Sequence, residues 1–292
     1  MSSAIRLDYR EPPQQWLQYL RALRRKTNTQ PQPELPPLNA FLVNQQARRR
    51  DVIRYARICG FDQHSPYLPI SYPHLMAFSL HMELMLHHQF PLNVMGLVHI
   101  RNRIQQHRPI RIEEPLDVHC YLSDCVETPR GIEFSIQTDI SRAGDIIWQE
   151  SSVMLARKAK PQTHTATIDK TALTPALPSY RHTERWTLGR DLGRRYASIS
   201  GDSNPIHLFA FSAKLFGFKR HIAHGMWSMA RVAAALCSHT NSGTLDIAFK
   251  QPIFLPNQVD LHYQINEQQI TEFDIRAIDN QRVHARGTLT PY

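Results

Sequence analysis

A short loop in the second half of the chain brings together residue types that can do acid–base chemistry. It carries a carboxylate, an amide and an imidazole at Asp202, Asn204 and His207, within one short turn. Gly201 and Pro205 supply the backbone freedom and the fixed φ that such a turn requires. An acid and an imidazole on a bent loop can hold one water or one substrate proton between them. The spacing therefore indicates acid–base catalysis.

Ordinary structural roles compete with that interpretation. Asp, Ser, Asn and Pro occur together in many surface turns, and Ser200 or Asp202 could simply cap the helix that follows. Short motifs also match by chance. The pattern is longer than the loop, however, because it runs from Tyr196 to Ala213 and continues in a second element at 217–226. That length favours a functional site.

The pattern resembles the hydratase-2 motif of MaoC-like enzymes, the (R)-specific enoyl-CoA hydratases and related acyl dehydratases of hot-dog fold. The matching features are an aromatic residue at Tyr196, the Gly-Asp and Asn-Pro pairs, an aliphatic residue before His207, and a small residue at Ala213. The resemblance covers the second half of the chain strongly and the first half more weakly. One departure is Leu208, because an acid is frequent there in the family. The contact made by that acid is not carried over.

The resemblance implies a role for each residue of the site. Asp202 and His207 would activate water and shuttle the proton, Asn204 would support the pair, and a backbone N–H near Gly225 would hold the thioester carbonyl. The predicted catalytic residues are Asp202, Asn204 and His207, and the predicted oxyanion and substrate-binding residues are Ser200, Gly225 and Met226. The reaction would be the reversible hydration of a 2-enoyl thioester to a (3R)-hydroxyacyl thioester. It would need no metal and no organic cofactor.

The composition is typical of a globular protein of two domains. The chain has 292 residues, 42% of them apolar, which is enough to bury a sizeable core. No apolar run approaches the roughly 18 residues that span a bilayer, and the N-terminus lacks the apolar core of a signal peptide. The four cysteines are scattered, as in proteins of a reducing compartment. We therefore expect a cytoplasmic protein without a membrane span.

The chain carries an excess of basic charge, with 34 basic and 25 acidic residues and a net charge of +9. Nucleic acid is not favoured as a partner, because no binding motif or aromatic platform accompanies the basic clusters at 21–26 and 48–54. An acyl carrier protein or the phosphates of coenzyme A would be attracted by the same charge. A solvated basic surface is the simplest alternative. Both interpretations also apply to Lys219, Arg220 and Arg231, near the loop.

The two halves of the chain are related. Residues 108–119 align without gaps on residues 251–262, with Pro, Ile, Asp and His at matching positions. Each half also has an apolar helical stretch, at 76–86 and at 226–236. The expected strands are 132–140 and 146–155 in the first half, and 244–250, 259–265, 273–277 and 283–289 in the second. Duplication predicts an α+β double hot-dog fold, with two antiparallel sheets that each wrap a central helix.

These patterns divide the chain into four parts. We expect an N-terminal helical extension and linker over 1–37, a degenerate hot-dog domain over 38–157, a linker over 158–180 and a catalytic hot-dog domain over 181–292. The extension contains an amphipathic helix at 12–26 that would pack on the body, with Trp16, Leu17, Leu20 and Leu23 along one face.

The first half lacks a second copy of the loop. Asp62 and His64 lie in the corresponding stretch but without the required spacing, and we interpret them as ordinary loop residues. We therefore expect one active site per chain, with the first half shaping a channel for the acyl tail.

Other functions remain open on the sequence. His207, His221 and His224 could hold a metal ion, although they are not a familiar zinc ligand set. A thioesterase could share the fold, whereas a non-catalytic acyl-thioester binder would not need an acid and a base together. A serine hydrolase is disfavoured, because no G-x-S-x-G elbow surrounds Ser203. The expected partners are an acyl-CoA or acyl-carrier-protein substrate and a possible second copy of the chain in a homodimer of double hot dogs.

Overall fold

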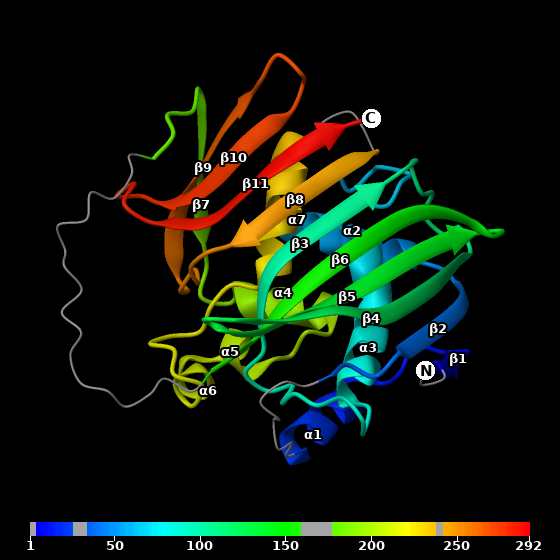
Figure 1. Cartoon of the computed structure of the whole chain (residues 1–292). Coiled ribbons are helices and arrows are strands. Elements are labelled where there is room, and N and C mark those ends of the chain that lie inside the picture. Colours follow the sequence, from blue (N-terminus) through cyan, green and yellow to red (C-terminus); the bar gives the residue numbers. More distant parts are fainter. Residues whose placement is uncertain (1–3, 26–33, 159–176, 238–241) are drawn as a thin grey trace.

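One continuous sheet carries both central helices (Figure 1). The computed structural model describes residues 4–25, 34–158, 177–237 and 242–292. Within them the strand order is β1-β2-β4-β5-β6-β3-β8-β11-β10-β9-β7. The strands are β1 (Ile5–Tyr9), β2 (Leu38–Gln45), β3 (Val98–Gln106), β4 (Leu116–Thr128), β5 (Gly131–Arg142), β6 (Asp145–Arg157), β7 (His182–Leu188), β8 (Gly243–Phe249), β9 (Asn257–Ile265), β10 (Thr271–Ala277) and β11 (Val283–Pro291). The helices are α1 (Gln15–Arg24), α2 (Arg49–Cys59), α3 (Pro73–Leu86), α4 (Leu192–Ser200), α5 (Pro205–Leu208), α6 (Ala210–Lys214) and α7 (Gly225–Leu236).

The sheet consists of two half-sheets that each curl around one helix (Figure 1). The first half-sheet has the order β2-β4-β5-β6-β3 and holds α3, and the second has the order β8-β11-β10-β9-β7 and holds α7. All neighbouring strands within each half are antiparallel. The predicted α+β double hot-dog fold is confirmed, and the six predicted strands are all present.

The two half-sheets are joined edge to edge, so the two predicted sheets form one continuous sheet. Strand β3 pairs antiparallel with β8, with Asn102 opposite Ile247 and Ile104 opposite Leu245. The side chains of Ile104, Leu245 and Ile247 are buried, so this junction belongs to the core. Pairing the two edges also satisfies backbone groups that an open sheet edge would leave exposed.

Both central helices are apolar on nearly all sides, because each is enclosed by its curved half-sheet. Helix α7 begins at Gly225 and helix α3 at Pro73, slightly earlier than predicted. Pro73 fits the first turn of α3 because the first N–H groups of a helix have no intrahelical acceptor. Met226 and Met229 are buried and pack in the core, as the sequence suggested.

The duplication is visible in the backbone. In the first half the Leu68 N–H donates to the Ile110 carbonyl at 2.8 Å, and in the second half the Ala223 N–H donates to the Ile253 carbonyl at 2.9 Å. Ile110 and Ile253 occupy matching positions of the predicted repeat. Each bond ties the segment before a central helix to the segment that leads into the next strand, so both halves close in the same way.

The N-terminal extension differs from the prediction in two respects. It is not only helical, because β1 pairs parallel to β2, where Ile5, Leu7 and Tyr9 alternate with exposed residues and pack against the core. Helix α1 packs on the body as expected, but through its polar side, with Gln18 buried. The apolar residues predicted to face the body are exposed: Trp16 63%, Leu17 42%, Leu20 42% and Leu23 60%.

A buried acid explains the orientation of α1. Glu83 of α3 accepts hydrogen bonds from Gln18 Nε2 at 2.8 Å, from Arg21 Nη1 at 2.8 Å and from the Tyr9 hydroxyl at 3.3 Å. A carboxylate removed from water requires such donors. Two of the three donors, Gln18 and Arg21, lie on the polar face of α1, so that face turns inward.

Most residues of the two predicted linkers lie outside the described residues. Of residues 158–180 only Lys158 and residues 177–180 are described, and the first linker is described from Glu34 onward. Among the described helices, none has the length and apolar character needed to cross a membrane.

Candidate active site

The acid–base loop connects two helices at their ends. Helix α4 ends at Ser200 and is capped by Gly201, whose φ of 74° lies in the left-handed region. The Asn204 side chain caps α5 by accepting a hydrogen bond from the Ile206 N–H at 3.4 Å. Asn204 has an extended backbone, with φ −55° and ψ 124°, as a residue before proline favours. The residue that caps α5 is therefore Asn204, and not Ser200 or Asp202.

His207 is held as a neutral base. Its side chain is buried, and its Nδ1 lies 2.9 Å from the Ile222 carbonyl oxygen. A carbonyl oxygen only accepts, so Nδ1 carries the proton and Nε2 keeps a lone pair. Burial and the neighbouring His224 lower the pKa of His207 to about 3, against the opposing effect of Asp202. At neutral pH the imidazole therefore offers Nε2 as an acceptor.

Asp202 is held as an ionised carboxylate with one oxygen engaged. Its Oδ1 accepts hydrogen bonds from the Tyr19 hydroxyl at 2.7 Å and from the Asn204 N–H at 3.2 Å. Burial acts to raise the pKa of Asp202, but the imidazoles of His224 and His207 and these two hydrogen bonds hold it below its ordinary value. The side chain is 28% exposed, so the carboxylate is still accessible.

His224 fastens the loop to the start of α7. Its Nε2–H donates to the Asp202 backbone carbonyl at 2.9 Å, and its ring stacks on that of His207, with centroids 3.7 Å apart. Burial lowers the pKa of His224, so the ring is neutral at neutral pH. The only functional role that the sequence suggested for His224 was that of a metal ligand. Its place directly before Gly225 was the one signal that could have identified this role.

The start of α7 presents backbone donors to the site. Gly225 is the first residue of the helix, and the first N–H groups of a helix have no intrahelical acceptor. A Cβ at Gly225 would stand 3.0 Å from the Phe249 ring, so a side chain there would displace that ring. Met226 is buried and lines the same cavity as Gly225. These positions suit the predicted oxyanion and substrate-binding roles, which stay predictions.

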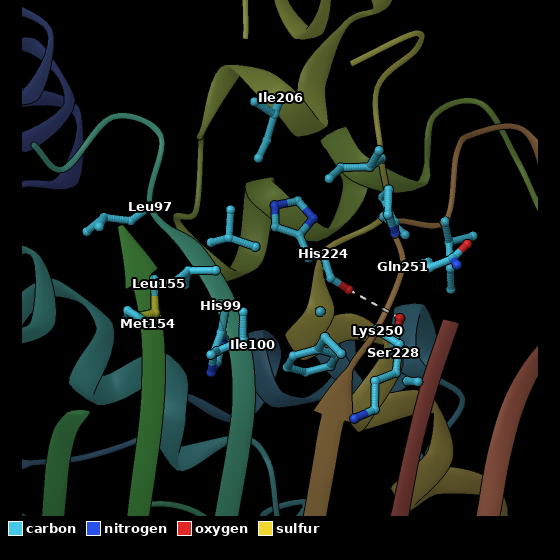
Figure 2. Close-up of a pocket in the computed structure, with 18 of the residues that line it drawn as sticks. Leu97, His99, Ile100, Met154, Leu155, Ile206, His224, Ser228, Lys250 and Gln251 are labelled. Carbon is cyan, nitrogen blue, oxygen red and sulfur yellow. Dashed lines mark hydrogen bonds between the residues drawn. The ribbon is translucent and has the colours of Figure 1, made fainter. Parts of the chain in front are cut away.

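The loop and the start of α7 line a cavity of about 580 Å³. All three predicted catalytic residues, Asp202, Asn204 and His207, lie in its wall. The first half contributes a largely apolar wall, in which Figure 2 shows residues of β3 and β6 and the residue before β3: Leu97, His99, Ile100, Met154 and Leu155. Lys250 and Gln251, which follow β8, lie on the other side of His224 (Figure 2). The two halves therefore build the cavity together.

Ser200 lies outside the cavity wall, contrary to its predicted contact with substrate. Its hydroxyl donates to the Tyr196 carbonyl at 3.0 Å and accepts a hydrogen bond from the Asp202 N–H at 3.2 Å. A serine near a helix end commonly bonds the carbonyl four residues earlier. Ser200 therefore shapes the turn that carries Asp202.

The basic residues near the loop do not form a phosphate site. Arg231 pairs with Glu184 at 2.7 Å and lies over the Trp186 ring at 4.9 Å, so it is neither a phosphate contact nor a solvated cation. Lys219 and Arg220 are exposed, as expected for solvated residues, and neither lines the cavity.

Asp62 and His64 form a local turn in the first half. The His64 N–H donates to Asp62 Oδ1 at 2.9 Å, and both residues are exposed. This arrangement agrees with their interpretation as loop residues.

Potential metal ligands come together in two groups of described residues. Within each group the ligand atoms lie within 4.8 Å of one another; the groups are Asp202, His207 and His224, and His74, His81 and Glu150. The trio suggested by the sequence is not formed, because His221 Nε2 donates to the Arg190 carbonyl at 2.8 Å. A metal at the loop would occupy the carboxylate and His207 Nε2, the same atoms that acid–base chemistry requires.

Comparison with known proteins agrees with this site. The model of the MaoC like domain family matches residues 165–285, which contain the loop and α7. The 3-hydroxyacyl-thioester dehydratase X of Mycobacterium tuberculosis is 30% identical over 222 residues, covering 73% of this chain and 75% of that protein. The chain belongs to the MaoC-like dehydratase family.

Solved structures extend the MaoC-like similarity to both halves. The crystal structure of HtdX from Mycobacterium tuberculosis matches with a TM-score of 0.74 at 25% identity, covering 87% of this chain and 100% of that chain. A MaoC-like dehydratase from Phytophthora capsici matches in fold with a TM-score of 0.69 at 18% identity, covering 87% of this chain and 95% of that chain. The MaoC-like architecture therefore includes the first half, which the family model does not match.

Proposed function

We propose that this MaoC-like dehydratase interconverts 2-enoyl and (3R)-hydroxyacyl thioesters by adding or removing water. The observation that carries the proposal is an ionised Asp202 beside a neutral His207 in the wall of one cavity, at the start of helix α7. The similarity to a 3-hydroxyacyl-thioester dehydratase supports the same class of reaction.

The protonation states define how the proton moves. Neither Asp202 nor His207 carries a spare proton at neutral pH, because the pKa values of both are lowered. The proton that reaches Cα must therefore come from the attacking water. In hydration, His207 Nε2 takes a proton as the water oxygen bonds to Cβ, and then returns it to Cα. The Asp202 carboxylate orients the water and stabilises the transient imidazolium, and dehydration reverses these steps.

The thioester oxygen gains negative charge when the double bond is attacked. The N–H of Gly225 is suited to hold it, because a helix start combines free backbone donors with the positive end of the helix dipole. The missing side chain at Gly225 lets the thioester approach the backbone. The acyl tail would then extend along the apolar residues of β3 and β6.

The carrier of the acyl group would meet basic residues in the cavity wall. Arg130, Arg157, Lys158 and Lys250 line it. Arg130 pairs with Glu133, and Lys158 pairs with the exposed Glu127. Among the ion pairs of the described residues none involves Arg157 or Lys250, so these two cations are the ones disposed toward the phosphates of coenzyme A or of a carrier-protein arm.

The proposal is tested by removing the acid and the base separately. We expect Asp202→Asn and His207→Ala each to lower kcat by about 10²–10⁴, because positioned proton transfer contributes that much. The measurement is loss of the enoyl-thioester absorbance with crotonyl-CoA and longer 2-enoyl-CoAs, with the chirality of the product determined. Ser203→Ala is the matched control in the same loop: Ser203 is exposed and does not line the cavity.

Three outcomes would contradict the proposal. Near-wild-type turnover in either variant would remove the acid–base pair from the mechanism. Release of free coenzyme A without hydration, detected with a thiol reagent, would assign a thioesterase instead. Binding of acyl-CoA with neither reaction would leave a non-catalytic binder.

A further inference from the structure

The N-terminal helix α1 reaches the active-site loop from a distant part of the chain. The Tyr19 hydroxyl donates to Asp202 Oδ1 at 2.7 Å, across 183 positions of sequence. One turn earlier in α1, Gln15 Nε2 donates to the Ser200 carbonyl at 3.3 Å. The anchoring of α1 to Glu83 holds the helix in this place.

The loop is shaped to receive α1. A Cβ at Gly201 would overlap the side-chain amide of Gln15. The absent side chain at Gly201 therefore serves the left-handed turn and also makes room for the helix. The contact between α1 and the loop is a fitted surface, with Tyr19 at the acid.

Tyr19 is a neutral donor over the working pH range. Burial and the negative charge of Asp202 raise the pKa of the Tyr19 phenol, so the hydroxyl keeps its proton wherever Asp202 is ionised. Together with the Asn204 N–H, it gives Oδ1 two donors. Since a carboxylate oxygen has two lone pairs, Oδ1 is then satisfied and Oδ2 is left for water.

We infer that Tyr19 is a positioning residue for the reaction: it fixes the Asp202 carboxylate so that Oδ2 receives the substrate water, and it favours the ionised form. The inference rests on the proposed function, because it gives Tyr19 a part in the same proton transfer. Tyr19 does not line the cavity, so it acts through Asp202 and not on the substrate.

The test is Tyr19→Phe, which removes one oxygen and keeps the ring. We expect kcat to fall about tenfold, with KM for the enoyl thioester changed less than about twofold. Asp202 works in its ionised form, and losing a donor to that form raises its pKa. The acidic limb of the pH–rate profile should therefore move to higher pH, a change that a merely structural role would not produce.

Tyr9→Phe is the matched control. The Tyr9 hydroxyl bonds to Glu83 at 3.3 Å and ties the same N-terminal segment to the body without contact to Asp202. We expect its pH–rate profile to coincide with that of the wild type. An unmoved acidic limb in Tyr19→Phe, or an equal movement in Tyr9→Phe, would overturn the inference.

A second readout separates this inference from the proposed function. Carbon NMR of ¹³C-labelled aspartate, with Asp202→Asn to assign the signal, reports the titration of Asp202 without turnover. If the wild type hydrates no enoyl thioester, the proposed function fails. The NMR titration still tests the effect of Tyr19 on Asp202 in that case. If the pKa of Asp202 is the same in the wild type and in Tyr19→Phe, the inference about Tyr19 is overturned as well. Should Tyr19→Phe not fold, Gln18→Ala loosens α1 away from the loop and should move the titration in the same direction.

Discussion

In the proposed mechanism Gly225 provides a backbone donor, in a space that the Phe249 ring nearly fills. A Cβ at this position would lie 3.0 to 3.2 Å from three carbons of the Phe249 ring. We expect Gly225→Ala to push the ring into the cavity and to lower kcat/KM for enoyl thioesters by about tenfold or more. The free energy of unfolding should fall by about 1–3 kcal/mol, as for other overpacked sites. Steady-state kinetics and urea unfolding measure the two effects.

The companion variant is Gly225→Ala combined with Phe249→Leu. Leucine is smaller than the ring, so the pair should regain part of the stability lost by the single substitution. Full activity of Gly225→Ala alone would show that the close fit to Phe249 has no part in binding the thioester.

At the residue scale, the sequence predicted the loop but not its surroundings. Asp202, Asn204 and His207 were found because they lie within one turn and their spacing is local. Tyr19 and His224 act through contacts with the loop that depend on the fold. Tyr19 could not be predicted at the loop, because the apolar face of α1 with its leucines was predicted to face inward.

A buried, hydrogen-bonded glutamate joins α3 to the first half-sheet. Glu150 of β6 is 2% exposed and accepts hydrogen bonds from His74 Nδ1 at 2.8 Å and Asn102 Nδ2 at 2.5 Å. Burial acts to raise the pKa of Glu150, but His74, His81 and Asn102 lower it to about 2. We expect Glu150→Gln to lower the free energy of unfolding by about 3 kcal/mol at pH 7, because it removes the ionised carboxylate whose pKa the folded state lowers.

The lowered pKa of Glu150 also determines how its contribution to stability depends on pH. The folded-state pKa of Glu150 is below its ordinary value of 4.5, so its contribution is fully present above pH 4.5 and is lost as the pH falls toward about 2. Urea unfolding should therefore show the wild type and Glu150→Gln converging in acid. Glu127→Gln, which breaks an exposed pair with Lys158, is the control and should change little. A constant difference between wild type and Glu150→Gln at all pH values would contradict the assignment.

At the element scale, the central helices and most strands of the second half could be predicted, because each has a regular apolar pattern. Strands β1, β2, β3, β4 and β7 were missed. In β3 the buried residues that alternate with the exposed arginines include the polar Asn102, and one of the neighbours of β3 is β8 of the other half. Such pairing is decided by the tertiary fold, which local pattern does not contain.

At the scale of the whole molecule, the two halves should unfold together. They share the β3–β8 junction, and Trp227 of α7 donates to the Ile58 carbonyl of α2 at 3.1 Å. The test is a variant with Trp16→Phe and Trp148→Phe, in which only the second half carries tryptophan. We expect its urea unfolding transition measured by circular dichroism to coincide with the transition measured by tryptophan fluorescence. Two separate transitions would show that the junction does not couple the halves.

The contact between α1 and the loop also bears on how this chain can be divided. The segment that matches the family model, residues 165–285, ends before the last strand is complete and omits Tyr19 and the apolar wall from β3 and β6. A fragment cloned to those limits, or a loop grafted onto another hot-dog scaffold, would carry the acid and the base without the groups that orient them. The working unit for any activity screen is therefore the whole chain, with its N-terminus left free of fusions that would displace α1.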